Sequence, residues 1–169
     1  MAYRLVFLDG EEAMRWSWQD PDNRYGSRHH AAELQRTGLA PRVKARVLID
    51  LVGDRDLRLT TDSNSDERLL EAFFGAARRA GLGRHVDGER LPVKDDHLSF
   101  MELDIRSVDL IDFDYGPGNA YWHSREDTLD KVSRESLGVA GRILLLGLPA
   151  VEELRSEEHT SELQSLAYL

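Results

Sequence analysis

The chain has 169 residues, of which 41% are hydrophobic and 31% are charged, which is enough apolar material for one domain with a buried core. Its net charge of −9 excludes the basic surface that nucleic-acid binding needs, and its lack of cysteine excludes disulfides and thiolate metal sites. The longest apolar run, residues 143–151, is far shorter than the roughly 20 residues of a membrane-spanning helix, so no membrane span is expected.

The N-terminal third is expected to hold a buried strand, a loop and a helix. The strand is predicted by the apolar run at residues 4–8, which stops at Asp9-Gly10. Residues 16–26 contain Pro, Asn and Gly and are expected to form the loop. The helix should run from Ser27, as its N-cap, to about Arg36.

The remaining elements alternate between strands and helices, which is the pattern of an α/β domain. We expect strands at 43–51 and 105–113, a short edge strand at 57–60, helices at 65–80 and 133–148, and loops at 83–96 and 114–123. The helix at 65–80 is the clearest of these, because its apolar residues share one face and Gly81 follows as a stop.

Both ends of the chain depart from what a complete domain usually has. The chain opens almost inside the expected buried strand, and residues 155–165 resemble the translation of a sequencing-library adapter. We therefore expect an incomplete reading frame, with a domain over residues 1–150 and an artefactual tail over 151–169. The alternative for the tail is a natural polar helix.

Paired carboxylates follow the first apolar run and are the strongest candidates for chemistry. Glu11 and Glu12 come directly after Gly10, at the carboxyl end of the expected strand, where α/β enzymes keep their sites. One glutamate can bind a metal while its neighbour moves a proton. The alternative is an exposed acidic turn.

Other candidates lie beside turn signals further along the chain. His123 is a potential imidazole ligand, and Trp122 beside it could form a pocket wall, although a surface histidine next to a core-edge tryptophan is the alternative. Asp50 ends a strand and is equally well explained as a ligand, a hydrogen-bonding brace or a turn cap. Asp95 is favoured as a functional acid, whereas Asp96 is favoured as an N-cap for the segment after it.

Several segments together resemble the glutaminyl-peptide cyclotransferases, which belong to the broader family of zinc aminopeptidases. The likeness covers about residues 3–148, and its motifs occur in the order of the family. The matching segments are Phe7-Leu8-Asp9-Gly10-Glu11-Glu12-Ala13, Trp16-Ser17, Tyr25-Gly26-Ser27-Arg28-His29, Leu48-Ile49-Asp50-Leu51-Val52-Gly53, Asp95-Asp96-His97-Leu98, Trp122-His123-Ser124 and Asp127-Thr128-Leu129-Asp130-Lys131-Val132.

The resemblance implies a role for each candidate. It implies a three-layer α/β fold with a mixed, twisted sheet and helices on both faces. Glu11 would be the general base, and Asp50 and Asp95 would form an acid network around the reacting amine. Glu12 and His123 would bind one zinc ion. Trp16 and Trp122 would line the pocket for an N-terminal glutamine of a peptide substrate.

The chain also departs from the family pattern at two points. The family has a third zinc ligand, an aspartate on a segment before Glu11, which this sequence lacks. Asp109 stands where animal cyclases carry a pocket histidine. The resemblance therefore implies the C-terminal portion of a cyclotransferase or peptidase domain.

Three functions remain open from the sequence. The first is a zinc-dependent cyclotransferase that forms pyroglutamate from N-terminal glutamine and releases ammonia. The second is a zinc aminopeptidase, in which Glu11 activates water and Asp50 serves a second metal. The third is a catalytically incomplete fragment with weak metal binding. The compartment is left open, and secretion or export to the periplasm is an expectation for a full-length parent.

Overall fold

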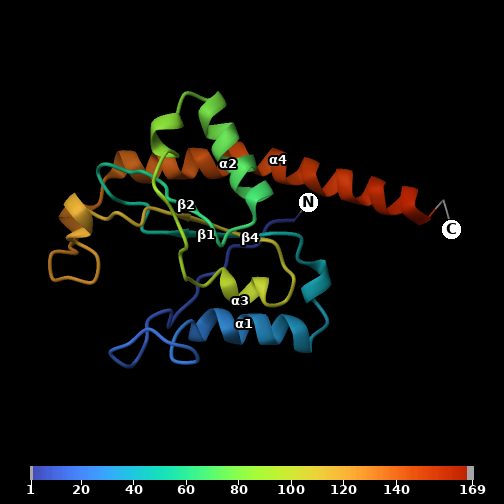
Figure 1. Ribbon diagram of the computed structural model, residues 1–169, viewed down its shortest axis with the longest axis horizontal. Coiled ribbons are helices and arrows are strands. Elements are labelled where there is room, and N and C mark those ends of the chain that lie inside the picture. Colours follow the sequence, from blue (N-terminus) through green and yellow to red (C-terminus); the bar gives the residue numbers. More distant parts are fainter. Residues whose placement is uncertain (1, 167–169) are drawn as a thin grey trace.

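The computed structural model describes the backbone of residues 2–166 and the side chains of residues 2–154. Two short parallel sheets lie between helices: α1 and α3 on one side, and α2 and α4 on the other (Figure 1). The elements are α1 (Tyr25–Arg36), η1 (Ala40–Arg42), β1 (Arg46–Asp50), β2 (Thr61–Asp62), α2 (Glu67–Arg79), η2 (Gly83–His85), β3 (Arg90–Leu91), α3 (Leu98–Met101), β4 (Ser107–Ile111), η3 (Pro117–Asn119), η4 (Leu129–Lys131) and α4 (Arg134–Leu166). The expected three-layer α/β arrangement is confirmed.

The central strand pair positions the site. β1 and β4 pair in parallel, with Leu48 opposite Asp109 and Asp50 opposite Ile111. All five residues of β4 are buried, as expected of a strand covered on both faces. Because β1 ends at Asp50, the carboxylate of that residue lies at the carboxyl edge of the sheet. β2 and β3 form a second, shorter parallel pair.

Helix α2 forms as the apolar periodicity predicts. Its N-cap Asp66 accepts a hydrogen bond of 3.0 Å from the backbone N–H of Leu69, and Gly81 follows the helix with a φ of +77°. The buried face of α2 packs on α4, where Phe73 lies against Gly147. A Cβ on Gly147 would come 2.1 Å from the Phe73 ring, so glycine is what lets the two helices approach.

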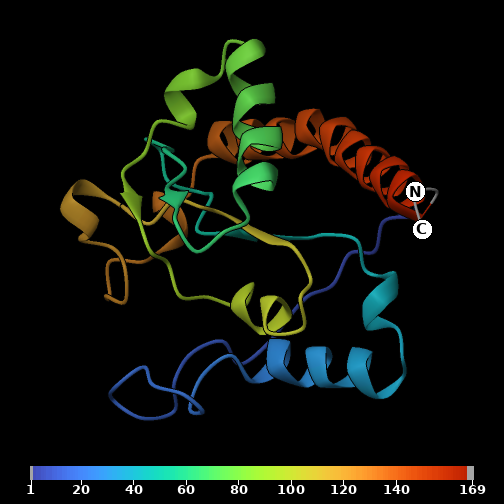
Figure 2. The same cartoon turned by 45° about the vertical axis from the view of Figure 1, so that its right-hand side comes forward.

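The expectation of a buried strand at residues 4–8 is wrong. These residues form no strand, and the side chains of Leu5 and Phe7 are 87% and 96% exposed. Only the alternate side chains turn inward, as with Leu8, which packs on the small apolar cluster between α1 and α3. In Figure 2 the dark blue N-terminal segment is drawn without a strand arrow. An apolar run indicates a segment that favours burial, but a strand also needs a neighbouring strand to pair with. Among the described residues no strand lies beside this segment.

The expected end of the last helix at 148 is also wrong. Helix α4 continues through Pro149 to Leu166, and Val151 is buried in the main core. The division expected between residues 150 and 151 therefore falls inside a helix. Residues 167–169, and the side chains from residue 155 on, lie outside the described part. No helix in the described part is long and apolar enough to cross a membrane.

Smaller corrections concern capping and strand ends. Ser27 is not the N-cap of α1: it lies inside the helix, and Arg24, with a φ of 52°, precedes the first turn. The edge strand expected at 57–60 does not form. These residues belong to a loop that leads into β2, and the loop places Leu57 and Leu59 in the core. The loop expected at 83–96 contains the short strand β3. The strands at 43–51 and 105–113 form in shortened versions.

Candidate functional site

The loop that carries the paired glutamates is held by the start of helix α1. The backbone N–H groups of Arg24, Tyr25 and Gly26 donate to the carbonyls of Glu11, Gly10 and Asp9, at 2.8, 2.8 and 3.0 Å. The first N–H groups of a helix have no partner within the helix, so they are available for such contacts. Gly10 adopts a φ of +61°, which glycine tolerates best. These contacts fix the direction in which the loop presents its glutamates.

Glu12 and His123 lie in direct contact. The Nε2 of His123 is 2.8 Å from the Oε1 of Glu12, and both side chains are about half exposed. The Trp122 ring stacks on the imidazole with ring centroids 4.1 Å apart. The proximity predicted for these two residues is therefore confirmed.

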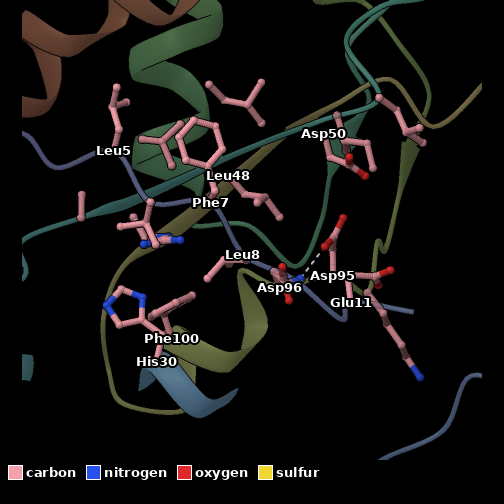
Figure 3. A pocket seen from close by; sticks show the side chains of 18 of the residues that line it. Leu5, Phe7, Leu8, Glu11, His30, Leu48, Asp50, Asp95, Asp96 and Phe100 are labelled. Carbon is pink, nitrogen blue, oxygen red and sulfur yellow. Dashed lines mark hydrogen bonds between the residues drawn. The ribbon is translucent and has the colours of Figure 1, made fainter. Parts of the chain in front are cut away.

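A cluster of acids lies beside this pair. Asp50 comes from the end of β1, Asp95 and Asp96 from the turn before α3, and Glu11 from the N-terminal loop. Figure 3 shows their carboxyl groups gathered on one side of the cavity. Asp95 and Asp96 are buried, which is unusual for carboxylates.

Burial and mutual repulsion make these acids weaker than usual. Burial, followed by the charges of Glu12, Asp96 and Asp50, raises the pKa of Glu11 to about 7. The pKa of Asp95 rises to about 8, mainly through burial and then through the charges of Asp50 and Glu11. Burial also raises the pKa of Asp50, and a hydrogen bond with the Asp95 carboxyl opposes that rise. The cluster therefore holds protons near neutral pH, as acid–base chemistry requires.

One wide cavity of about 2250 Å³ brings the predicted residues together. Its lining includes all seven sequence candidates, Glu11, Glu12, Trp16, Asp50, Asp95, Trp122 and His123. Trp122 packs on Phe113, with ring centroids 5.4 Å apart, whereas the side chain of Trp16 is fully exposed at the rim. The cavity also has an apolar wall that includes Leu5 and Phe7. It is thus a groove with acids along part of its surface.

Two acids lie elsewhere than the sequence suggested, and one tryptophan of the cavity was not predicted. Asp96 does not cap α3; it is buried and accepts a hydrogen bond from Ser27, and burial raises its pKa. Asp109 is fully buried and does not belong to the cavity lining. Trp18 was missed: it also lines the cavity and hydrogen-bonds to Glu11, which lowers the pKa of that acid. No local signal distinguishes Trp18 from Trp16 in the sequence.

The donors at the rim suit zinc in their chemistry. An imidazole nitrogen and a carboxylate oxygen that already touch are the ligand types of catalytic zinc sites. Among the described residues, however, no group of three His, Asp or Glu side chains is arranged to bind a metal. Glu12 and His123 therefore fit two positions of a zinc site, and the described part does not complete it.

Comparisons with known proteins show which proteins the chain is similar to. A family model described as peptidase family M28 matches residues 2–147. Among solved structures, an Acidobacteriales bacterium glutaminyl cyclase is 39% identical with a TM-score of 0.83, covering 87% of this chain and 52% of that one. A Fimbriiglobus ruber glutaminyl cyclase is 26% identical with a TM-score of 0.69, covering 85% and 51%.

The chain is also similar to a glutaminyl-peptide cyclotransferase from a snake. The glutaminyl-peptide cyclotransferase of Boiga irregularis is 28% identical, over 85% of this chain and 44% of the relative. A zinc-dependent exopeptidase from Parabacteroides distasonis, at 22% identity, a TM-score of 0.67 and coverage of 82% and 51%, shares the fold. The chain thus spans about half the length of the relatives it matches.

Proposed function

The chain belongs to peptidase family M28, and from this premise we propose that it is part of a zinc-dependent glutaminyl-peptide cyclotransferase. The observation that carries the proposal is the meeting of Glu11, Asp50 and Asp95 with the Glu12–His123 pair on one groove. The 39% sequence identity to a glutaminyl cyclase supports the cyclase over the peptidase. The solved exopeptidase and leucine aminopeptidase precursor are only 22% and 24% identical to this chain.

In this proposal Glu11 is the residue that moves the proton. It takes a proton from the α-amine of an N-terminal glutamine as that nitrogen attacks Cδ, the carbonyl carbon of the side-chain amide. A new C–N bond closes the pyroglutamate ring, the old C–N bond breaks, and the proton leaves with ammonia. A pKa of about 7 suits a group that must both accept and release a proton near neutral pH.

Asp50 and Asp95 are proposed to hold the amine beside Glu11. Their carboxyl groups hydrogen-bond to each other, so together they offer a proton and acceptor oxygens to an incoming nitrogen. Trp122, and Trp16 at the rim, would pack on the glutamine side chain. Glu12 and His123 would bind one zinc ion, which when bound would polarise the γ-carbonyl as a Lewis acid.

The test is a product assay with zinc supplied. A peptide with N-terminal glutamine is incubated with the purified chain and with the chain extended by any coding sequence that precedes it. Release of ammonia with pyroglutamate at the peptide N-terminus supports the proposal. Release of a free amino acid without ammonia overturns it in favour of an aminopeptidase.

A second candidate is a catalytically incomplete fragment. It is favoured by the absence of a third ligand near Glu12 and His123 within the described residues. The 169-residue chain alone is compared with the extended chain in the same assay. If the 169-residue chain releases neither product and the extended chain releases ammonia, the shorter chain is an incomplete fragment and the extended protein is a cyclase.

A further inference from the structure

A buried carboxylate behind the groove ties together a loop of the site. Asp62, at the end of β2, is fully buried and is not part of the cavity lining. Its Oδ1 accepts hydrogen bonds of 2.9 Å from the backbone N–H groups of Asn64 and Val93. Its Oδ2 accepts a hydrogen bond of 2.6 Å from the Ser65 hydroxyl. The Nε2 of His97, also fully buried, lies 3.2 Å from the same Oδ2.

These contacts reach both ends of the loop over residues 93–97. The backbone N–H of Val93 donates to Asp62 at one end, the His97 imidazole lies against the Asp62 carboxylate at the other, and Asp95 is midway between them in the sequence. The Asn64 side chain strengthens the first end by donating to the carbonyl of Val93 at 2.7 Å. Buried polar contacts of this kind are costly to break, because each broken contact leaves an unpaired group.

The other face of His97 meets the central sheet. Its Nδ1 lies 3.7 Å from the Oδ2 of Asp109, which is fully buried in β4. The backbone N–H of Asp109 donates to Ser65, the same hydroxyl that donates to Asp62. Burial, followed by the charges of Asp95 and Asp50, holds the pKa of Asp109 well above its usual value. His97 thus lies between the loop anchor and the strand that pairs with β1.

We propose that Asp62 and His97 are positioning residues, which hold both ends of loop 93–97 and thereby set where the Asp95 carboxyl lies beside Asp50 and Glu11. Neither residue lines the groove, so their effect on substrate passes through Asp95. The use of Asp95 in catalysis rests on the proposed function, whereas the anchoring of its loop does not.

The test compares Asp62→Asn with the unchanged chain by amide hydrogen exchange and NMR. The amide variant keeps the shape of the side chain but loses the negative charge that faces His97 and the bound N–H groups. We expect exchange at Val93 and Asp96 to become about tenfold faster or more, while exchange within α2 stays unchanged. We also expect the pKa of Asp95, followed through its labelled carboxyl, to fall towards the usual value as water reaches the loosened loop.

Two further variants keep the test decisive. Asp66→Asn is the matched control, because Asp66 caps α2 and its change should affect α2 without a selective effect on loop 93–97. Asn64→Ala removes only one loop contact and provides the answer if Asp62→Asn fails to fold. A selective increase in loop exchange in that variant supports the proposal.

The proposal is overturned if exchange rises equally in the loop and in α2, or if loop exchange and the Asp95 titration stay unchanged. Neither readout uses substrate, metal or turnover. Failure of the cyclase assay would therefore leave the anchoring intact, and failure of the anchoring would leave the assay result intact.

Discussion

The imidazole of His123 lies 2.8 Å from the carboxylate of Glu12, although the two residues come from opposite parts of the chain. Glu12 is presented by a loop bound to the start of α1, and His123 by the long loop after β4. Their contact brings the two loops to one rim of the groove. It also provides two donors, one nitrogen and one oxygen, for a single metal ion.

Zinc binding by the 169-residue chain should be weak, because two protein ligands leave the coordination shell half filled. Calorimetric titration with zinc should show low affinity, and His123→Ala should abolish what remains. His29→Ala, which changes an exposed histidine away from the pair, is the control and should bind like the original chain. Tight binding of one equivalent that survives His123→Ala would contradict the assignment of this ligand pair.

Glu11→Gln should lower the rate of ammonia release by about 10²–10⁴ in a form of the protein that turns over, which is the usual contribution of a positioned general base. The change should act mainly on kcat, since the amide is nearly the same size as the acid. The exposed Glu89 provides the control as Glu89→Gln, for which steady-state kinetics should be unaltered. Equal rates in the two variants would exclude Glu11 as the base.

Stability should fall as the pH rises through the neutral range. The pKa of Asp95 is raised in the folded chain to about 8 from an ordinary value of 3.8, so its stabilising effect is complete below that ordinary value and is lost as the pH approaches 8. The raised pKa values of Asp50, Asp96 and Asp109 act in the same direction.

Urea unfolding should therefore give a higher midpoint at about pH 5 than at about pH 9, because each unit of pKa difference corresponds to about 1.4 kcal/mol. Asp95→Asn removes one titrating group and should flatten this dependence. Asp87→Asn changes an exposed aspartate and should preserve the slope. A midpoint that rises with pH in the original chain would show that the buried acids do not carry raised pKa values.

The contact of α2 with α4 should not tolerate a methyl group at Gly147. A Cβ there would meet the ring of Phe73, so Gly147→Ala should cost about 1–3 kcal/mol in the free energy of unfolding, the usual range for overpacking. Gly138→Ala in the same helix meets no atom within 4 Å and should stabilise the chain by about 0.5–1 kcal/mol. Chemical denaturation measures both, and a neutral Gly147→Ala would refute the close packing.

The two phenylalanines Phe7 and Phe73 should respond in opposite ways to loss of the ring. Phe73 is fully buried, so Phe73→Ala should destabilise the chain by about 3–5 kcal/mol. Phe7 is almost fully exposed, so Phe7→Ser should change stability by less than about 0.5 kcal/mol. The serine variant should also aggregate less and bind less of a hydrophobic dye, because it removes part of an exposed apolar surface. A large loss of stability from Phe7→Ser would restore the buried-strand expectation.

The sequence predicted the elements in which local signals agree. The helix at α2 follows from its apolar face and its terminal glycine, and β1 and β4 follow from apolar runs that fill the centre of the fold. The seven site candidates also proved to line one cavity. Local signals failed at residues 4–8, where the run is apolar but has no described neighbour to pair with, and at the end of α4, which continues past Pro149.

What the sequence determined by itself is the set of residue types: paired glutamates after a glycine turn, acids at strand and helix ends, and a tryptophan–histidine pair in a loop. Only the tertiary structure decided which of them meet. The contact of Glu12 with His123, and the placement of Asp62 against His97 behind Asp95, depend on how distant segments pack. Such packing sets burial and the distances between charges, and these in turn set the pKa values, so the chemistry of the groove is a property of the fold.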